Sequence, residues 1–198
     1  MRKKLATVLT SMLLLTSCSP RDFLTRRLAT ALIASSDTFK APQQYVLHIG
    51  VLSNKEYLSP EYLVVQRHGW ISVTSSACTP GLVPPPCWNV LLTPSGVETI
   101  RTLVADEEAR KPLITIPVAK RELIGVTGVS KQGNIADVEF TWKWIPMNEV
   151  GDALFSGDLR YKSIVGFRQY DDGWRLEPTT AHTRQTMDDA LKNAEPVS

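Results

Sequence analysis

Histidine is scarce in this chain, with only His48, His68 and His182 spread over 198 residues. None of the three has a metal-ligating residue three or four positions away, the spacing that brings two ligands together on a helix. The chain also contains no Gly-x-Ser-x-Gly or His-Glu-x-x-His motif, no phosphate-binding loop and no dinucleotide fingerprint. These absences predict no catalytic residue set, no metal site and no cofactor.

Positive charge is missing from one long stretch, because residues 70–93 contain no Lys or Arg. Three of the 22 basic residues lie in the first 17 positions, so 19 basic and 20 acidic residues remain after them. Phosphate contacts dominate the affinity of proteins for DNA. The near-neutral charge and the uncharged stretch therefore exclude a nucleic-acid partner.

The first 18 residues form a basic start and a short apolar run. Residues 5–15 would make a helix of about 16 Å, which is too short for a hydrocarbon core of about 30 Å. The run ends at Leu15-Thr16-Ser17-Cys18, which resembles the lipobox of bacterial lipoproteins. The alternative is an ordinary secretory signal followed by an unrelated cysteine.

The lipoprotein resemblance has definite consequences. It implies that residues 1–17 are a signal peptide, that the Cys18 thiol carries diacylglycerol, and that the new amino terminus receives a further acyl chain such as palmitate. More than one acyl chain is enough for stable anchoring. Position 19 is Ser rather than the Asp that retains many such proteins in the inner membrane. The expected location is the cell envelope, at the periplasmic face of the outer membrane if the cell has one.

Two cysteines remain after Cys18, namely Cys78 and Cys87, and the loop between them is rich in proline. An exported chain enters a compartment in which disulfides persist. A zinc site would need further Cys or His ligands nearby, and a redox pair more often has the Cys-x-x-Cys spacing. The pair is therefore predicted to form a structural disulfide.

The first part of the mature chain, residues 18–110, alternates predicted helices and strands. The expected order is a helix over 22–34, a strand over 45–51, a helix over 60–69, strands over 70–74 and 88–92, and a helix over 93–105. This order resembles winged-helix domains over residues 22–105. Those domains use a basic wing on DNA, and the corresponding segment of this chain has no basic residue.

The second part, residues 111–178, is predicted to be an antiparallel meander of four to five strands. Gly125 and Gly128 indicate bulges or bends in it, and Asp171-Asp172-Gly173 is a hairpin signal. The segment is similar to the curved sheets of NTF2-like or cystatin-like domains over residues 113–177. The remaining segment, 179–198, is predicted to contain a helix over 187–194 followed by a tail. The predicted fold class is α+β, with N-terminal helices and a small β-hairpin followed by a curved antiparallel β-meander.

An aromatic stripe marks the clearest strand of the chain. Phe140, Trp142 and Trp144 alternate with Glu139, Thr141 and Lys143, the pattern of a half-buried strand. The stripe either lines an apolar ligand pocket or forms the core beneath a helix, and the core is the favoured interpretation.

The sequence thus predicts a lipid-anchored envelope protein, attached to the membrane through Cys18, that binds another envelope protein without catalysis. One alternative is a carrier of a small molecule or lipid with an apolar pocket near Trp142 and Trp144. Another is an NTF2-like enzyme, which would need a polar group such as Asp137 or His48 inside that cavity.

Overall fold

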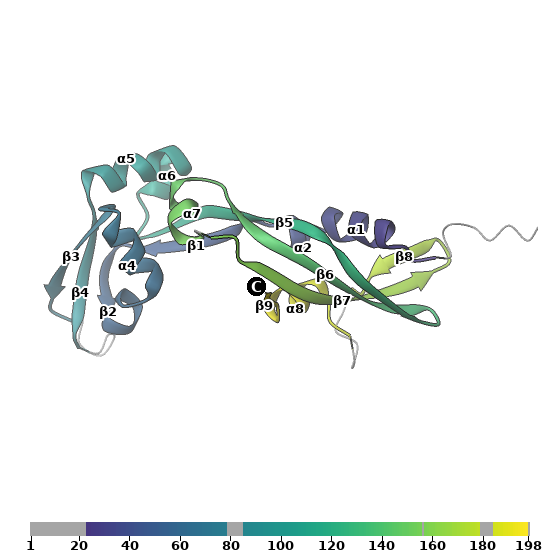
Figure 1. Cartoon of the computed structure of the whole chain (residues 1–198). Coiled ribbons are helices and arrows are strands. Elements are labelled where there is room, and N and C mark those ends of the chain that lie inside the picture. The colour runs from purple at the N-terminus through teal and green to yellow at the C-terminus, as the bar shows by residue number, and fades with distance from the viewer. Residues whose placement is uncertain (1–22, 79–84, 156, 179–183, 198) are drawn as a thin grey trace, which may run out of the picture.

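The computed structural model describes residues 23–78, 85–155, 157–178 and 184–197. Within them lie eight helices and nine strands, arranged in an elongated molecule with two antiparallel sheets (Figure 1). The predicted α+β class is confirmed. None of the helices in these described ranges is long and apolar enough to cross a membrane.

The larger sheet forms the long axis of the molecule (Figure 1). Its strand order is β1-β5-β6-β7-β8, and β9 pairs with β7 on the same edge as β8. The strands are β1 (Gln43–His48), β5 (Leu113–Gln132), β6 (Ile135–Pro146), β7 (Arg160–Tyr170), β8 (Gly173–Leu176) and β9 (Glu195–Val197).

The smaller sheet lies at one end of the molecule, which we call the head (Figure 1). It consists of β2 (Gly50–Ser53), β4 (Cys87–Leu92) and β3 (Ile71–Ser76) in that order. All three strands are uncharged, and β4 pairs antiparallel with both neighbours.

Three helices cover one face of the larger sheet. The other five described helices lie around the head and the first residues of β5. The first group is α1 (Arg26–Ser35), α2 (Asp37–Lys40) and α8 (Met187–Lys192). The second group is α3 (Asn54–Tyr57), α4 (Pro60–Arg67), α5 (Pro94–Leu103), α6 (Asp106–Ala109) and α7 (Glu149–Leu154).

Two hydrophobic clusters correspond to these two groups of helices. One joins Ile33 of α1 and Phe39 of α2 to Phe140 and Phe167 of the larger sheet. The other joins Leu52 and Val90 of the head to Ile116 of β5. Helix α1 and strand β1, from the first part of the chain, pack with the larger sheet. The domain division at residue 110 stays a prediction.

The prediction of one strand over residues 45–51 was wrong, because the chain changes sheets there. Strand β1 ends at His48 and β2 begins at Gly50. Gly50 has a φ of 119°, a value that side-chain-bearing residues rarely adopt. The glycine therefore allows the turn that carries the chain from the larger sheet into the head.

The glycine signals in the second part had different outcomes. Residues 113–132 form one continuous strand, β5, whose register with β6 shifts between Leu123 and Gly125 and between Val126 and Gly128. The two irregularities lie at the glycines where bulges or bends were predicted. The hairpin at Asp171-Asp172-Gly173 is also confirmed, since it joins β7 to β8 with Gly173 at a φ of 131°.

Candidate functional site

A pocket of about 430 Å³ lies where the head meets the larger sheet. Strand β1 contributes Tyr45, the segment from α3 to α4 contributes Glu56, Glu61 and Tyr62, and the end of α7 contributes Phe155. Pockets that bind small ligands or single side chains are concave, with apolar walls and a few converging polar groups. This pocket has that composition and is the candidate functional site.

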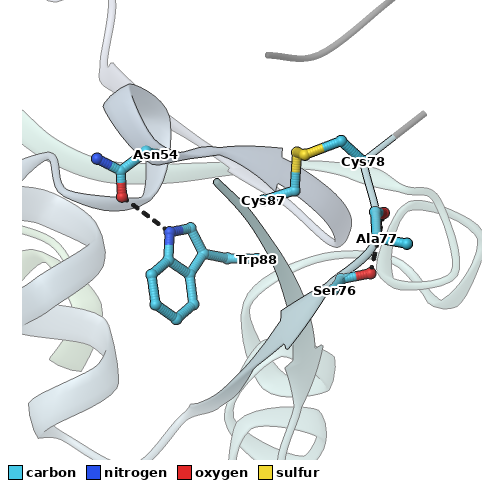
Figure 2. Close-up of a disulfide and its surroundings, with 6 residues drawn as sticks. All are labelled: Asn54, Ser76, Ala77, Cys78, Cys87 and Trp88. Carbon is cyan, nitrogen blue, oxygen red and sulfur yellow. Dashed lines mark hydrogen bonds between the residues drawn. A yellow bond between two sulfur atoms is a disulfide. The ribbon is translucent and has the colours of Figure 1, made fainter. Parts of the chain in front are cut away.

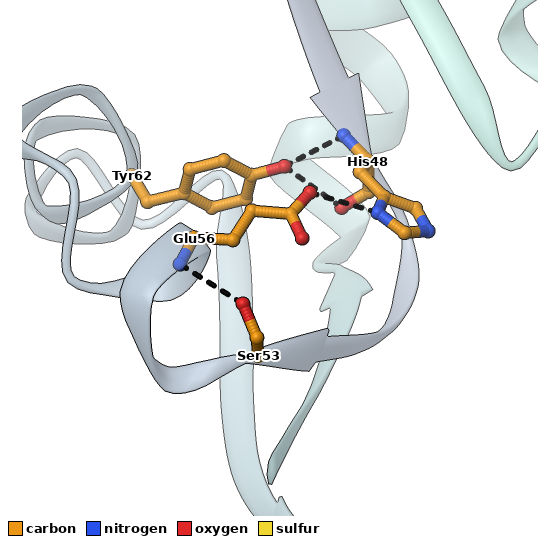
Figure 3. Close-up of polar contacts among 4 residues, drawn as sticks. All are labelled: His48, Ser53, Glu56 and Tyr62. Atoms are coloured by element: carbon orange, nitrogen blue, oxygen red, sulfur yellow. Dashed lines mark hydrogen bonds and ion pairs between the residues drawn. The ribbon is translucent and has the colours of Figure 1, made fainter. Parts of the chain in front are cut away.

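A network of hydrogen bonds fixes the wall of the pocket at the end of β1 (Figure 3). The Tyr62 hydroxyl accepts from the His48 backbone N–H at 2.7 Å and donates to the His48 carbonyl at 3.2 Å. The His48 ring Nδ1 lies 2.9 Å from Oε1 of Glu56. The Glu56 backbone N–H in turn donates to Oγ of Ser53 at 3.2 Å. Strand β1, α3 and α4 are therefore held together by polar contacts beside the pocket.

Tyr45 has a buried hydroxyl without a hydrogen-bond partner among the described residues. Its side chain is 9% exposed, and its ring packs edge-on against Tyr62 at 6.4 Å between centroids. Its oxygen makes no hydrogen bond within the described residues. An unsatisfied buried hydroxyl costs about 1–3 kcal/mol, so Tyr45 is a site of local destabilisation beside the pocket.

The two tyrosines are expected to titrate late. Burial raises the pKa of Tyr62 to about 12. Burial also raises the pKa of Tyr45 well above its ordinary value, and the neighbouring Tyr62 and Glu61 raise it further. A tyrosine with a raised pKa in the fold stabilises the fold below its unfolded pKa of about 10 and loses that contribution as the pH rises further. Stability should therefore fall above pH ~10.

Absorbance at 295 nm during an alkaline titration checks this expectation. Two of the five tyrosines should ionise only at the high end of the titration, and Tyr62→Phe should remove one of these late events. Tyr170→Phe is the control, because Tyr170 is 39% exposed. Simultaneous ionisation of all five residues in the folded protein would contradict the expectation.

Helix α7 completes the pocket through an unusually close contact with β5. The Asn148 side chain caps the helix by accepting from the Gly151 backbone N–H at 2.9 Å, and it donates to the Pro117 carbonyl at 2.7 Å. A Cβ atom on Gly151 would lie 1.9 Å from the Val118 carbonyl oxygen. The glycine thus lets α7 approach β5 closely enough to bring Phe155 to the pocket.

A second depression of about 430 Å³ lies between α4 and α7. His68 and Trp70 stack on one side of it at 4.8 Å between centroids, and Glu149 and Asp152 lie on the other. Among its lining residues, all of which the structure describes, no buried polar side-chain atom lacks a partner. It is the weaker candidate for a ligand site.

The predicted aromatic stripe is split between core and surface. Phe140 and Trp142 are 0% and 2% exposed and belong to the cluster around α1 and α2. Trp142 donates its Nε1 hydrogen to Oγ of Ser163 at 3.0 Å, and its ring stacks on Tyr161 at 4.7 Å. These two side chains pack in the core, which is the interpretation that the sequence favoured.

Trp144 is the member of the stripe that reaches a cavity. It is half-buried, lies 5.5 Å from the Phe155 ring, and lines a space of about 120 Å³. The Arg121 guanidinium lies 4.6 Å from its ring centroid and donates to the Ala41 carbonyl just after α2 at 3.0 Å. Phe155 lines both this small space and the larger pocket, so Trp144 lies next to the candidate site.

The polar residues considered for catalysis lie outside the small cavity at Trp144. Asp137 and Trp142 are five positions apart in β6, so their side chains lie on opposite faces of the sheet. The Oδ1 atom of Asp137 is 3.3 Å from Nε of Arg184. His48 belongs to the Tyr62 network, and His182 lies outside the described residues. Asp172, in the predicted turn, forms an ion pair with Arg175.

The predicted disulfide is confirmed. Cys78 and Cys87 are bonded, with their Cα atoms 5.3 Å apart, and Cys87 begins β4 (Figure 2). Next to it, Trp88 donates its Nε1 hydrogen to Oδ1 of Asn54 at 2.9 Å. The disulfide closes the β3–β4 hairpin, and the Trp88 contact connects that hairpin to α3.

Breaking the disulfide is expected to lower the free energy of unfolding by about 2–3 kcal/mol, because the closed loop is short and its chain entropy is released. The separation is nine residues. The midpoint of urea unfolding with and without a reductant measures this. The Cys78→Ser/Cys87→Ser double variant is the control and should match the reduced protein. Equal midpoints for the oxidised and reduced protein would contradict the expectation.

The pocket residues Tyr45, Glu56, Glu61 and Tyr62 were not predicted from the sequence, and Cys18 lies outside the described residues. Within the described ranges no group of three or more His, Cys, Asp or Glu could hold a metal ion. The resemblances to winged-helix and NTF2-like domains stay predictions. Comparison of the chain with protein-family models, with curated proteins and with solved structures found no match.

Proposed function

We propose that this chain is a bacterial envelope lipoprotein, acylated at Cys18, that binds another envelope component without catalysis. The binding site in this proposal is the pocket lined by Tyr45, Glu61, Tyr62 and Phe155. The lipobox at residues 15–18 supports the anchor. The disulfide Cys78–Cys87 is consistent with an exported chain.

One observation carries the proposal: the head and the start of the described chain lie at opposite ends of the molecule (Figure 1), and the pocket lies where the head meets the larger sheet. Phe23 packs beside Lys131, close to the turn between β5 and β6. The head lies at the other end (Figure 1). Strand β5 runs from Val118 at the pocket to Lys131 beside Phe23, and these 13 positions correspond to roughly 43 Å of strand.

This separation suits a tethered binding protein. Phe23 follows Cys18 by only five positions, and such a segment reaches at most ~18 Å. An acyl anchor at Cys18 would therefore hold the Phe23 end near the lipid. The pocket would then project into the aqueous phase, where a partner can reach it.

Mass spectrometry of the protein extracted from bacterial membranes tests the anchor. The expected product begins at Cys18 and carries a thioether-linked diacylglycerol. The Cys18→Ser variant is the control and should keep its leader and lack lipid. An unmodified Cys18 in the native material would overturn the anchor and with it the envelope location.

Cross-linking and recovery of bound proteins from membranes tests the binding site. Val46→Trp should obstruct the pocket, because Val46 lines it and is 49% exposed. Leu91→Trp is the matched control, since Leu91 is 50% exposed on the small sheet and does not line the pocket. Loss of one specific partner with Val46→Trp but not with Leu91→Trp is the expected result. Equal recovery by both variants would contradict the proposed site.

A small-molecule carrier is the second candidate, and the volume of the pocket favours it. About 430 Å³ falls within the range of small-molecule sites, roughly 300–1,000 Å³, and Trp144 lies next to it through Phe155. Tryptophan fluorescence against a panel of apolar ligands distinguishes this candidate. A saturable change that Trp144→Phe removes would support it, and an unchanged spectrum with every ligand would exclude it.

A further inference from the structure

We infer that the pocket recognises a cationic group, an ammonium or guanidinium on a short apolar stem, as on a lysine or arginine side chain of the partner. This inference rests on the proposed function, because it names the chemistry of the ligand for the same pocket. Two features of the pocket support it: its charge and its aromatic walls.

The charged residues that line the pocket are both acidic. Glu56 and Glu61 lie on its wall, and no Lys or Arg is among its lining residues, all of which the structure describes. Glu56 uses Oε1 for the His48 ring, which leaves Oε2 for a ligand. Glu61 forms no ion pair with any residue in the described part of the chain. An incoming cation would therefore meet two carboxylates, of which Glu56 also contacts the His48 ring, and no Lys or Arg among the lining residues.

The walls of the pocket suit a cation with an apolar stem. Tyr45, Tyr62 and Phe155 contribute aromatic rings, and Val118 and Leu154 contribute aliphatic surface. A cation over an aromatic face is attracted by the quadrupole of the ring, and the attraction grows when water is excluded. The methylene groups of a lysine or arginine side chain pack on apolar surface while the charged end reaches polar groups.

The charge of the pocket distinguishes between classes of ligand. The N–H groups of an ammonium or guanidinium would give the carboxylates of Glu56 and Glu61 a counterion. An anion would meet repulsion from both glutamates, and a neutral alcohol would leave them without a counterion.

Titration with three small probes of equal length tests the inference: n-pentylammonium, n-pentanol and pentanoate. The protein is residues 18–198 with Cys18→Ser, which contains every described residue, and the readout is the shift of backbone amide resonances around Tyr45 and Val46. We expect n-pentylammonium to bind at least about tenfold more tightly than the other two. Equal or tighter binding of n-pentanol or pentanoate would overturn the inference.

Two charge-removing variants show whether the pocket carboxylate is responsible. Glu61→Gln should weaken n-pentylammonium binding by about fivefold, the effect of losing one partly exposed ionic contact. Glu98→Gln is the matched control, because Glu98 is exposed on α5 and away from the pocket. Unchanged affinity with Glu61→Gln, or equal losses with both variants, would overturn the inference. The thermal midpoints of both variants verify that each is folded.

Further titrations identify the source of the cation. They also distinguish failure of this inference from failure of the proposed function. The peptide acetyl-Gly-Lys-Gly-amide should bind as well as n-pentylammonium if the source is a protein side chain. Binding of n-pentylammonium without the peptide would keep the cation and assign it to a free amine. If n-pentanol binds best at the same amides, the cation is excluded while the pocket remains a binding site. If no probe binds and the Val46→Trp and Leu91→Trp variants recover the partner equally, both the inference and the proposed site fail.

Discussion

Gly151→Ala is expected to destabilise the protein by about 3 kcal/mol, the upper end of the usual cost of overpacking. The added Cβ would lie 1.9 Å from the Val118 carbonyl oxygen and 3.0 Å from its carbonyl carbon. Because both are backbone atoms of the central strand β5, no side-chain rotation can relieve the overlap. Helix α7 would have to move away from β5, and Phe155 with it. Urea unfolding monitored by circular dichroism measures the loss as a lower midpoint.

Gly125→Ala is the matched control for this effect. Gly125 lies in the same strand β5, a Cβ atom added to it would meet no heavy atom within 4 Å, and its φ is not positive. Its replacement should change the free energy of unfolding by less than about 1 kcal/mol. A stability of Gly151→Ala equal to that of Gly125→Ala would show that α7 does not pack on Val118 as described.

Phe140→Ala is expected to cost about 4 kcal/mol of folding free energy. The Phe140 ring is 0% exposed and packs edge-on against Phe39 of α2, with 6.2 Å between centroids. Removing it leaves a cavity where the larger sheet meets the N-terminal helices, and the surrounding backbone of three paired strands cannot collapse into the space. The midpoint of urea unfolding should fall with an unchanged dependence of free energy on urea.

Ile164→Ala provides the comparison on the opposite face of the same sheet. Ile164 pairs with Glu139, next to Phe140, and is 45% exposed. It should cost less than about 1 kcal/mol. A small loss of folding free energy in Phe140→Ala, together with loss of binding to an apolar ligand, would contradict the core assignment. It would support the alternative interpretation of the aromatic stripe as the lining of a ligand pocket.

Much of the larger sheet could be predicted because its signals are local. The alternation of Phe140, Trp142 and Trp144 with polar residues follows directly from the period of a strand with one buried face. Gly125 and Gly128 mark the bulges, and Asp171-Asp172-Gly173 marks a hairpin that needs no distant partner. Local rules of backbone geometry were sufficient at these positions.

The path of the chain through the two sheets could not be predicted in the same way. Residues 45–51 keep an alternating apolar pattern, although the chain leaves one sheet at His48 and enters another at Gly50. The pattern indicates which side chains are buried. It contains no information about which strand each segment pairs with. The pairing of β1 with β5 joins residues about seventy positions apart, and it depends on packing that no local window contains.

The sequence by itself determined the α+β class, the disulfide pair and the aromatic stripe, since each depends on residues that are neighbours in the chain or on a simple periodic pattern. The tertiary structure alone decided that Phe140 and Trp142 are core, and that Tyr45, Glu61, Tyr62 and Phe155 surround one pocket. These four residues come from three separate elements. Their proximity follows from the close contact of α7 with β5 and from the hydrogen bonds between Tyr62 and His48, which act between segments distant in the chain.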